Sequence, residues 1–214
     1  TTALGLEVQQ KDDNHCDLLS VLTHTCKIKD ALLTRPVQTK NKLSQIFAIP
    51  ATIALSGFDQ AVRSIPNKQL LLKQLLFELD GEFDYVLIDC PPSLGLMTIN
   101  ALVAAHEVFV PVQPEFFALQ GISQLLDTVK LLQKNLNPNL KIGGVLCTRF
   151  NRRKIHQEVL SCLEERFKAT LFATKIHENI AIAEAPSFGK TIFEYSPQSN
   201  GAYDFDLMVK EFLN

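Results

Sequence analysis

A single carboxylate, Asp89, ends the apolar run 85–88 and is followed by Pro91 and Pro92. The run is short and partly β-branched, which predicts a strand buried on both faces of a sheet. Proline cannot donate to a strand ladder, so we expect the strand to stop near Asp89. At the carboxyl end of such a strand, an aspartate can hold Mg²⁺ while the next loop contacts phosphates. The alternative is that Asp89 only caps the following turn or helix.

A second group of candidate residues is basic. Arg149, Arg152, Arg153 and Lys154 precede a predicted helix. Such a charge run is usually a solvated loop and helix start. The histidines (His15, His24, His106, His156 and His177) are scattered without metal-ligand or triad spacing. Ordinary surface or packed histidine is therefore expected.

Composition places these residues in an ordinary globular protein. The chain has 214 residues, 46% of them hydrophobic and 21% charged, with a net charge of −2. The length suits one α/β domain, and the charge gives no general attraction to nucleic acid or anionic lipid. No apolar run approaches the ~20 residues of a membrane helix, and residues 1–5 do not resemble a signal peptide. We expect no association with a membrane.

The cysteines predict a reducing compartment. They are Cys16, Cys26, Cys90, Cys147 and Cys162, an odd number without CxxC spacing. This pattern favours neither a zinc site nor a disulfide framework. Cys90 and Cys147 lie in or beside strand-like runs, where buried free thiols are common. A cytoplasmic location follows.

Apolar periodicity predicts alternating strands and helices along the chain. The expected strands are 43–49, 85–89, 107–112, 141–147 and 171–176. The expected helices are 17–22, 28–33, 53–64, 68–79, 97–105, 119–135, 155–167, 179–185 and 201–213. This alternation indicates an α/β fold, a mostly parallel sheet with helices on both faces, in a single domain over residues 1–214.

Several motifs in register carry a family resemblance. They are Ile88-Asp89-Cys90-Pro91-Pro92-Ser93-Leu94-Gly95, Asn100-Ala101-Leu102, residues 110–121, Ile176 with Asn179, residues 183–190 and residues 199–202. In this order the chain resembles the ParA/Soj group of partition ATPases, which belongs with MinD to the deviant Walker A class of P-loop NTPases. The likeness covers nearly all of the chain from Asp84 onward.

The resemblance also identifies a missing part. The family begins with a glycine-rich Walker A loop, whereas no GKT or GKS segment opens this chain. Gly189-Lys190-Thr191 is no substitute, because neither a glycine-rich run nor a strand precedes it. The resemblance thus implies that the first two strands and the phosphate cradle are absent, and we expect no ATP turnover from these 214 residues alone.

The resemblance assigns roles to individual residues. Asp89 corresponds to the catalytic, Mg²⁺-binding aspartate of a Walker B motif, and the implied switch residues are Pro91, Pro92, Ser93 and Gly95. Thr148, Arg149, Phe150, His177 and Asn179 correspond to residues near the nucleotide base. The implied DNA-binding residues are Arg152, Arg153, Lys154, Lys175 and Lys190. Two departures weaken these assignments: His177 stands where the family usually has proline, and Glu178 and Ala181 stand where relatives often have arginine. Asn179 could equally cap the next helix.

The implied function is chromosome or plasmid partition. In the family, ATP and Mg²⁺ close a homodimer that binds DNA nonspecifically, and a ParB-type partner stimulates hydrolysis; the expected location is the nucleoid within the cytoplasm. One alternative is MinD-like division-site placement, although this chain ends without a basic amphipathic helix. The other is a non-enzymatic interaction module, which the absent Walker A loop suggests.

Overall fold

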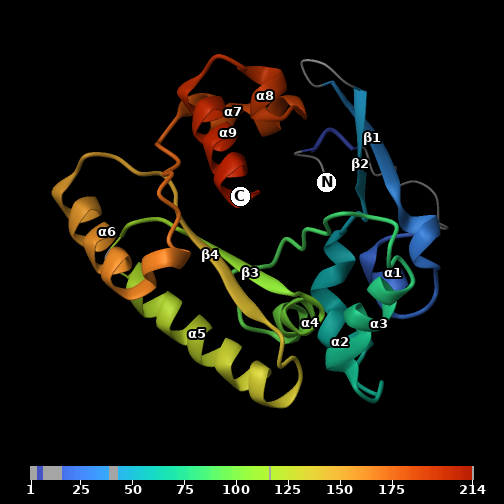
Figure 1. Cartoon of the computed structure of the whole chain (residues 1–214). Coiled ribbons are helices and arrows are strands. Elements are labelled where there is room, and N and C mark those ends of the chain that lie inside the picture. The colour runs from blue at the N-terminus through green and yellow to red at the C-terminus, as the bar shows by residue number, and fades with distance from the viewer. Residues whose placement is uncertain (1–3, 7–15, 39–42, 116, 214) are drawn as a thin grey trace. The chain divides into compact units, whose positions relative to one another are not determined.

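The computed structural model describes residues 4–6, 16–38, 43–115 and 117–213 of the chain (Figure 1). Its residues form two compact units, Thr1–Ala105 and His106–Asn214, and each is described by itself. The predicted positions His15 and Phe116 lie outside the described residues. Among the described helices, none is long and apolar enough to cross a membrane.

The first unit combines short helices with an antiparallel hairpin. Its strands β1 (Leu33–Gln38) and β2 (Leu43–Ala48) pair with Leu33 opposite Ala48. Its helical elements are α1 (Leu18–Leu22), η2 (Ile28–Ala31), η3 (Ile53–Gly57), α2 (Phe58–Ala61), η4 (Lys68–Leu70), α3 (Leu71–Phe77) and α4 (Leu96–Ala104). Apolar side chains from α1, α2, α3 and α4 form one core, which includes the fully buried Val21, Phe58 and Val62.

Helix α1 begins at a capping box. Asp17 Oδ1 accepts a hydrogen bond from the Ser20 backbone at 2.9 Å, and Ser20 Oγ accepts one from the Asp17 backbone at 2.8 Å. Thr52 Oγ1 donates to the other Asp17 oxygen at 2.6 Å. Burial opposes ionisation of Asp17, but these hydrogen bonds outweigh it and lower the pKa of the carboxyl. The cap therefore joins α1 to the segment before η3.

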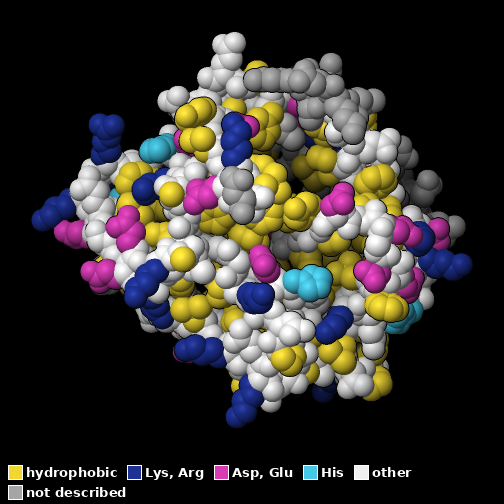
Figure 2. All heavy atoms as spheres, in the orientation of Figure 1, with side chains coloured by type: hydrophobic (Ala, Val, Ile, Leu, Met, Phe, Trp, Pro, Cys, Tyr) yellow, Lys and Arg dark blue, Asp and Glu magenta, His cyan; other side chains and the backbone are white. Residues whose placement is uncertain are grey.

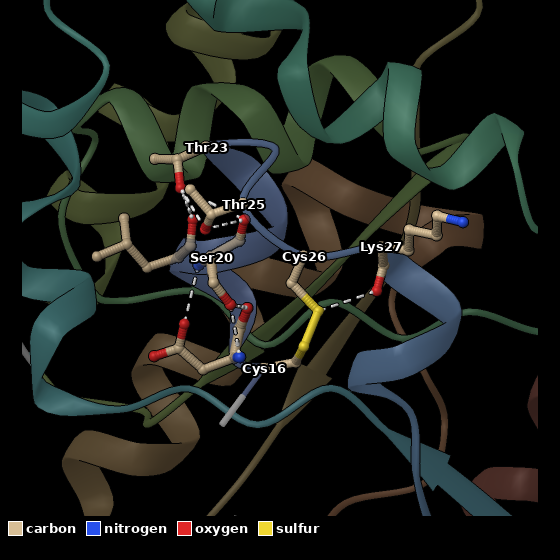
Figure 3. Close-up of a disulfide and its surroundings, with 8 residues drawn as sticks. Cys16, Ser20, Thr23, Thr25, Cys26 and Lys27 are labelled. Carbon is tan, nitrogen blue, oxygen red and sulfur yellow. Dashed lines mark hydrogen bonds between the residues drawn. A yellow bond between two sulfur atoms is a disulfide. The ribbon is translucent and has the colours of Figure 1, made fainter. Parts of the chain in front are cut away.

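A disulfide joins Cys16 to Cys26 across α1, with the Cα atoms 5.9 Å apart (Figure 3). The prediction against a disulfide is wrong. The backbone N–H groups of Thr25 and Cys26 both donate to the Ser20 carbonyl, at 2.8 and 3.2 Å, and so fold the chain back after α1. An odd cysteine count and the lack of CxxC spacing do not reveal such a local return of the chain.

Residues 85–89 do not form the buried strand that the sequence predicts. The segment has no strand partner among the described residues, and Leu87 is 89% exposed. A run of apolar residues becomes a buried strand only where neighbouring strands supply ladder partners. Cys90, predicted as a buried thiol, is likewise exposed.

Two further predictions for the first unit require correction or refinement. The expected helix 28–33 is only the single turn η2, because the chain enters β1 at Leu33. The pair Arg35-Pro36 lies within this two-stranded hairpin instead of ending a helix, in keeping with the tolerance of edge strands for proline. The remaining helices predicted for this unit are present, with shifted ends.

The second unit is built on a parallel pair of strands. Strands β3 (Glu107–Val112) and β4 (Lys141–Cys147) pair from Glu107 opposite Lys141 to Val112 opposite Cys147. The helical elements are α5 (Ala118–Asn135), α6 (Lys154–Phe167), η5 (Lys168–Thr170), α7 (Ile180–Glu184), η6 (Ala185–Phe188), α8 (Ile192–Tyr195) and α9 (Asn200–Phe212).

Helices contribute to both faces of this parallel pair. On one face, Val110, Val112 and Val145 pack with Ile122 of α5 and Val159 of α6. Phe109 contacts Phe212 of α9 on the other, with ring centroids 4.9 Å apart. The α/β prediction, with helices on both faces of parallel strands, is confirmed here.

Residues 171–176 lie beside β4 without forming the predicted strand. Phe172 N donates to Val145 O and Ile176 N to Cys147 O, both at 2.9 Å. Between these bonds, the N–H groups of Ala173 and Thr174 donate to the Glu211 carboxylate of α9, at 2.6 and 2.9 Å. Glu211 thus takes the Thr174 N–H, which a continuous ladder with β4 would use, and the pairing is reduced to isolated bridges.

Candidate functional site

In the first unit, Asp89 and the loop after it are exposed. Pro91, Pro92, Ser93 and Gly95 are also exposed. The Ser93 carbonyl accepts a hydrogen bond from Thr98 Oγ1 at 2.5 Å, and Gly95 is the N-cap residue of α4. The start of α4 therefore fixes the end of the predicted switch loop.

The described residues contain no group of three or more His, Cys, Asp or Glu side chains that could hold a metal ion. A lone exposed carboxylate such as Asp89 does not make a protein-only metal site. It does suit Mg²⁺, which usually retains several waters and is held by one or two carboxylates together with substrate phosphates. The residues present thus fit a metal that arrives with a nucleotide.

Asn100 positions the helix after this loop, a role that the sequence analysis did not assign. Its side chain is almost fully buried within an apolar helix and hydrogen-bonds to Lys68, Leu72 and Leu96. An asparagine in the otherwise apolar stretch 99–104 was the available signal. Buried polar side chains normally require hydrogen-bond partners, so this asparagine indicates a structural hydrogen bond.

In the second unit, the structure places Phe150 beside His177. Phe150 N donates to Ile176 O at 3.0 Å, and Glu178 N donates to Phe150 O at 3.1 Å. The rings of Phe150 and His177 meet edge to face with centroids 5.8 Å apart. Thr148 N donates to Val112 O at 2.8 Å, which places this segment at the carboxyl ends of β3 and β4. Ligands of α/β folds bind beyond such ends.

Asp204 of α9 fixes the orientation of His177. Its Oδ2 accepts a hydrogen bond from the His177 backbone at 2.9 Å and lies 3.0 Å from His177 Nδ1. Asp204 is buried, whereas the His177 side chain is 53% exposed. The sequence analysis missed Asp204. Its signal was a carboxylate among small and apolar residues of the last predicted helix.

Asn179 caps α7, as one of the two readings predicted. Its Oδ1 accepts a hydrogen bond from Ala181 N at 2.9 Å. A Cβ atom on Gly201 would lie only 3.3 Å from Asn179 Cγ and 2.7 Å from Ile182, so glycine permits close packing of α9 on α7. The role of Asn179 at a nucleotide base stays a prediction.

The predicted DNA-binding residues differ in their surroundings. Arg152, Arg153 and Lys154 are exposed at the start of α6, and Lys154 pairs with Glu158 at 3.7 Å. Lys190 is exposed after the left-handed Gly189. Lys175 instead lies over the Phe150 ring, 5.9 Å from its centroid. Lys and Arg side chains occupy several separate places on the face drawn in Figure 2.

Arg149 is engaged by the acidic residue that follows His177. It pairs with Glu178 at 3.5 Å, and Asn151 Nδ2 donates to Glu178 at 3.4 Å. The hydrogen bonds from Asn151 and Arg149 lower the pKa of Glu178. Glu178 therefore neutralises part of the positive charge of the basic segment.

Known proteins with similar sequences include chromosome-partitioning proteins. A family model described as an AAA domain matches residues 1–142. The chain is 41% identical over 198 residues to the chromosome-partitioning ATPase Soj of Treponema pallidum, covering 92% of this chain and 75% of that protein. It is 38% identical to the sporulation initiation inhibitor protein Soj of Bacillus subtilis, covering 97% and 79%.

Solved structures give the same fold. One is cobyrinic acid a,c-diamide synthase from Mycobacterium smegmatis, with bound ATP analog and magnesium. The match covers 95% of this chain and 72% of the synthase chain, with 31% identity and a TM-score of 0.74. Another is a McdA variant from Cyanothece in complex with ATP. That match covers 99% of this chain and 79% of the McdA chain, with 24% identity and a TM-score of 0.81. The latter likeness shows the fold alone. The family model and the Soj relatives establish that the chain belongs to the ParA/Soj family of partition ATPases.

Proposed function

We propose that this chain acts in chromosome or plasmid partition as part of an ATP- and Mg²⁺-dependent protein that binds DNA nonspecifically. The observation that carries the proposal is the 41% identity to the Treponema pallidum chromosome-partitioning ATPase over 198 residues. The bound ATP analog and magnesium of the mycobacterial synthase support the choice of nucleotide and metal.

Asp89 and the base-side residues have distinct proposed roles. Asp89 would hold Mg²⁺, directly or through water, and the loop from Pro91 to Gly95 would respond to the terminal phosphate. Thr148, Phe150 and His177 would contact the base beyond the carboxyl ends of β3 and β4. The metal, when bound, supplies charge neutralisation at the phosphates. No glycine-rich phosphate loop occurs in the 214 residues, so the phosphate contacts of this chain are not assigned.

The DNA contacts are proposed for the start of α6. Arg152, Arg153 and Lys154 are exposed there, and their charges suit phosphates in any base sequence. We further propose that ATP favours a homodimer and that a ParB-type protein stimulates hydrolysis. Both proposals rest on membership of the family.

A gel-shift titration of the full-length natural protein tests the DNA proposal. With ATP and Mg²⁺, duplexes of unrelated sequence should bind with similar affinity, and binding should weaken steeply as salt rises. Arg153→Ala should weaken binding to all duplexes and make the salt dependence shallower, whereas the exposed Arg63→Ala, in the first unit, should not. Equal binding by both variants and the wild type would exclude the start of α6 as the DNA contact. The interaction-module alternative predicts no binding of ATP or DNA.

A further inference from the structure

The feature that carries a further inference is the cysteine pair that flanks α1. Cys16 lies directly before the cap residue Asp17, and Cys26 follows the turn that ends the helix (Figure 3). The bonds that place Cys26 do not involve sulfur, because the N–H groups of Thr25 and Cys26 donate to the Ser20 carbonyl. The two sulfur atoms are therefore held near each other whether or not the bond between them is closed.

The amino-terminal side of α1 is fixed in the same way. Leu18 N donates to Pro50 O at 2.8 Å, and Thr52 Oγ1 donates to Asp17 at 2.6 Å. Helix α1 itself has only 5 residues, and a helix of that length is not stable alone. Contacts outside the helix, the disulfide among them, must hold the segment 16–26 in place.

Both cysteines can be reached from solvent. They are partly buried at the margin of the core of the first unit. Cys26 stands between the exposed Thr25 and Lys27, whereas Cys16 precedes the buried Asp17. An attacking thiolate therefore has the more open approach to Cys26 Sγ. Accessible disulfides of this kind are the labile and regulatory ones, in contrast to fully buried structural bonds.

We propose that Cys16 and Cys26 form a reversible redox site that exchanges with a low-molecular-weight thiol such as glutathione. In reduction, the thiolate of this thiol attacks Cys26 Sγ, the sulfur–sulfur bond breaks, and Cys16 leaves as a thiolate that takes up a proton. A second molecule of the thiol then attacks the mixed disulfide at the small-molecule sulfur and releases Cys26. Two small thiols thus become one small disulfide, and oxidation runs the same steps in reverse.

The inference rests on the proposed function, because a bacterial chromosome lies in the cytoplasm, where thiols are kept reduced. Disulfides that form in such a compartment are usually transient or redox-sensing. Oxidation closes the loop around α1 and removes conformational freedom from the open segment. Reduction should therefore let α1 open locally more often while the rest of the first unit stays folded.

The first test equilibrates the full-length natural protein, without oxygen, in mixtures of reduced and oxidised glutathione. Acid quenching, alkylation of free thiols and peptide mass spectrometry then give the fraction of protein with the Cys16–Cys26 bond. This fraction should fall from most of the protein in oxidised glutathione to a minor part in reduced glutathione, and it should be the same from either starting state. A bond that stays closed at every ratio, or that never forms, would overturn the inference.

Hydrogen exchange shows whether the bond acts on α1. The amides of Val21 and Thr23 donate to carbonyls four residues earlier in the chain. They should exchange roughly 10- to 100-fold faster in the reduced protein, because the cross-link no longer restricts the open state. Amides of α5, in the second unit, should exchange at the same rate in both forms. Equal exchange of the α1 amides in both forms would also overturn the inference, because the bond would then have no effect on the helix.

Cys16→Ser cannot form the bond, and Cys162→Ser is the matched control, because Cys162 is a free, exposed thiol of the second unit. In Cys16→Ser, α1 should exchange at the rate of the reduced wild type in every buffer, whereas Cys162→Ser should respond to glutathione as the wild type does. Neither measurement depends on ATP or DNA. A protein that shows both effects but binds neither ligand keeps the redox site and contradicts only the proposed function. A protein that binds both ligands but lacks either effect loses the redox site alone.

Discussion

The side-chain oxygen of Asn100 accepts the backbone N–H of Leu72 at 3.2 Å, while its amide nitrogen donates to the carbonyls of Lys68 and Leu96 at 2.9 and 3.0 Å. One buried side chain thereby joins α4 to η4 and α3. The exposed loop from Pro91 to Gly95 leads directly into α4. Because Asn100 fixes the position of α4, it also fixes the end of this loop.

Replacement of Asn100 with alanine should destabilise the first unit. The substitution leaves the backbone N–H of Leu72 and the carbonyl of Lys68 without their hydrogen bonds to the Asn100 side chain. We expect this loss to lower the free energy of unfolding by about 2–3 kcal/mol. Urea denaturation followed by circular dichroism measures this change. Asn135→Ala, at the exposed end of α5, removes only a local bond to Leu131 and should cost about 0.5 kcal/mol or less. Equal effects of the two substitutions would contradict the role assigned to Asn100.

The Cys16–Cys26 disulfide should stabilise the first unit under oxidising conditions. It closes a loop with a sequence separation of 10 around α1. Loop-closure entropy predicts a contribution of about 3 kcal/mol for a loop of this size. Cys16→Ser should therefore lower the melting temperature of the oxidised protein by roughly 5–10 °C.

The control for the disulfide is the exposed, free Cys162. Cys162→Ser should leave the melting temperature unchanged, and a dithiol reductant should lower that of the wild type but not that of Cys16→Ser. A melting temperature that is insensitive to reductant in the wild type would show that the disulfide contributes nothing to stability.

The free cysteines should differ in reactivity. Burial raises the pKa of Cys147 to about 11, and the nearby Lys175 lowers it only in part. Burial and the nearby Asp89 also raise the pKa of Cys90. Since the thiolate is the reactive form, a disulfide reagent at pH 8 should modify the exposed Cys162 first, the exposed Cys90 more slowly, and Cys147 only on unfolding. Mass spectrometry of the modified peptides identifies the sites, and rapid modification of Cys147 in the folded protein would contradict its burial.

Glu211 should make the free energy of unfolding depend on pH in the acid range. Burial opposes its ionisation, but hydrogen bonds from Thr174 and Ala173 outweigh it and lower the pKa in the folded state. The contribution of Glu211 to the free energy of unfolding is then complete above its pKa in the unfolded state, about 4.3. It disappears as the pH falls through the lower pKa of the folded state.

Glu211→Gln should consequently be less stable than the wild type at pH 7, and the difference should shrink as the pH falls below about 4. Glu165→Gln, on the exposed side of α6, is the control and should change stability little at either pH. Denaturant midpoints across this pH range measure the effect. A difference between Glu211→Gln and the wild type that grows in acid would reverse the assigned sign.

The sequence predicted elements best where its signals were local. Strand 107–112 and strand 141–147 have the predicted bounds, because each is a short apolar run between breaking residues. Helix α5 differs from its prediction by one residue at its start, since its apolar spacing persists over several turns. The capping role of Asn179 was also readable, because asparagine before a helix has a known local use.

Most of the misses depend on partners that are distant along the chain, and one depends on a local turn. Whether 85–89 or 171–176 forms a strand depends on neighbouring backbone, and in the second case on Glu211 from the last helix. The Cys16–Cys26 bond required knowing that the chain turns back after α1. Asp204 could not be linked to His177 from their spacing, because α9 and the segment after β4 meet only in the folded unit.

The most direct test of the central claim is isothermal titration of the full-length natural protein with ATP, with and without Mg²⁺, for the wild type and Asp89→Ala. We predict that Mg²⁺ increases the affinity of the wild type for ATP and that Asp89→Ala removes most of this increase, because the carboxylate is the proposed protein contact of the metal. The exposed Asp59→Ala, in α2, should behave as the wild type does. ATP affinity that is independent of Mg²⁺, or equally dependent on it in Asp89→Ala, would contradict the assignment of Asp89 as the metal-binding residue of a partition ATPase.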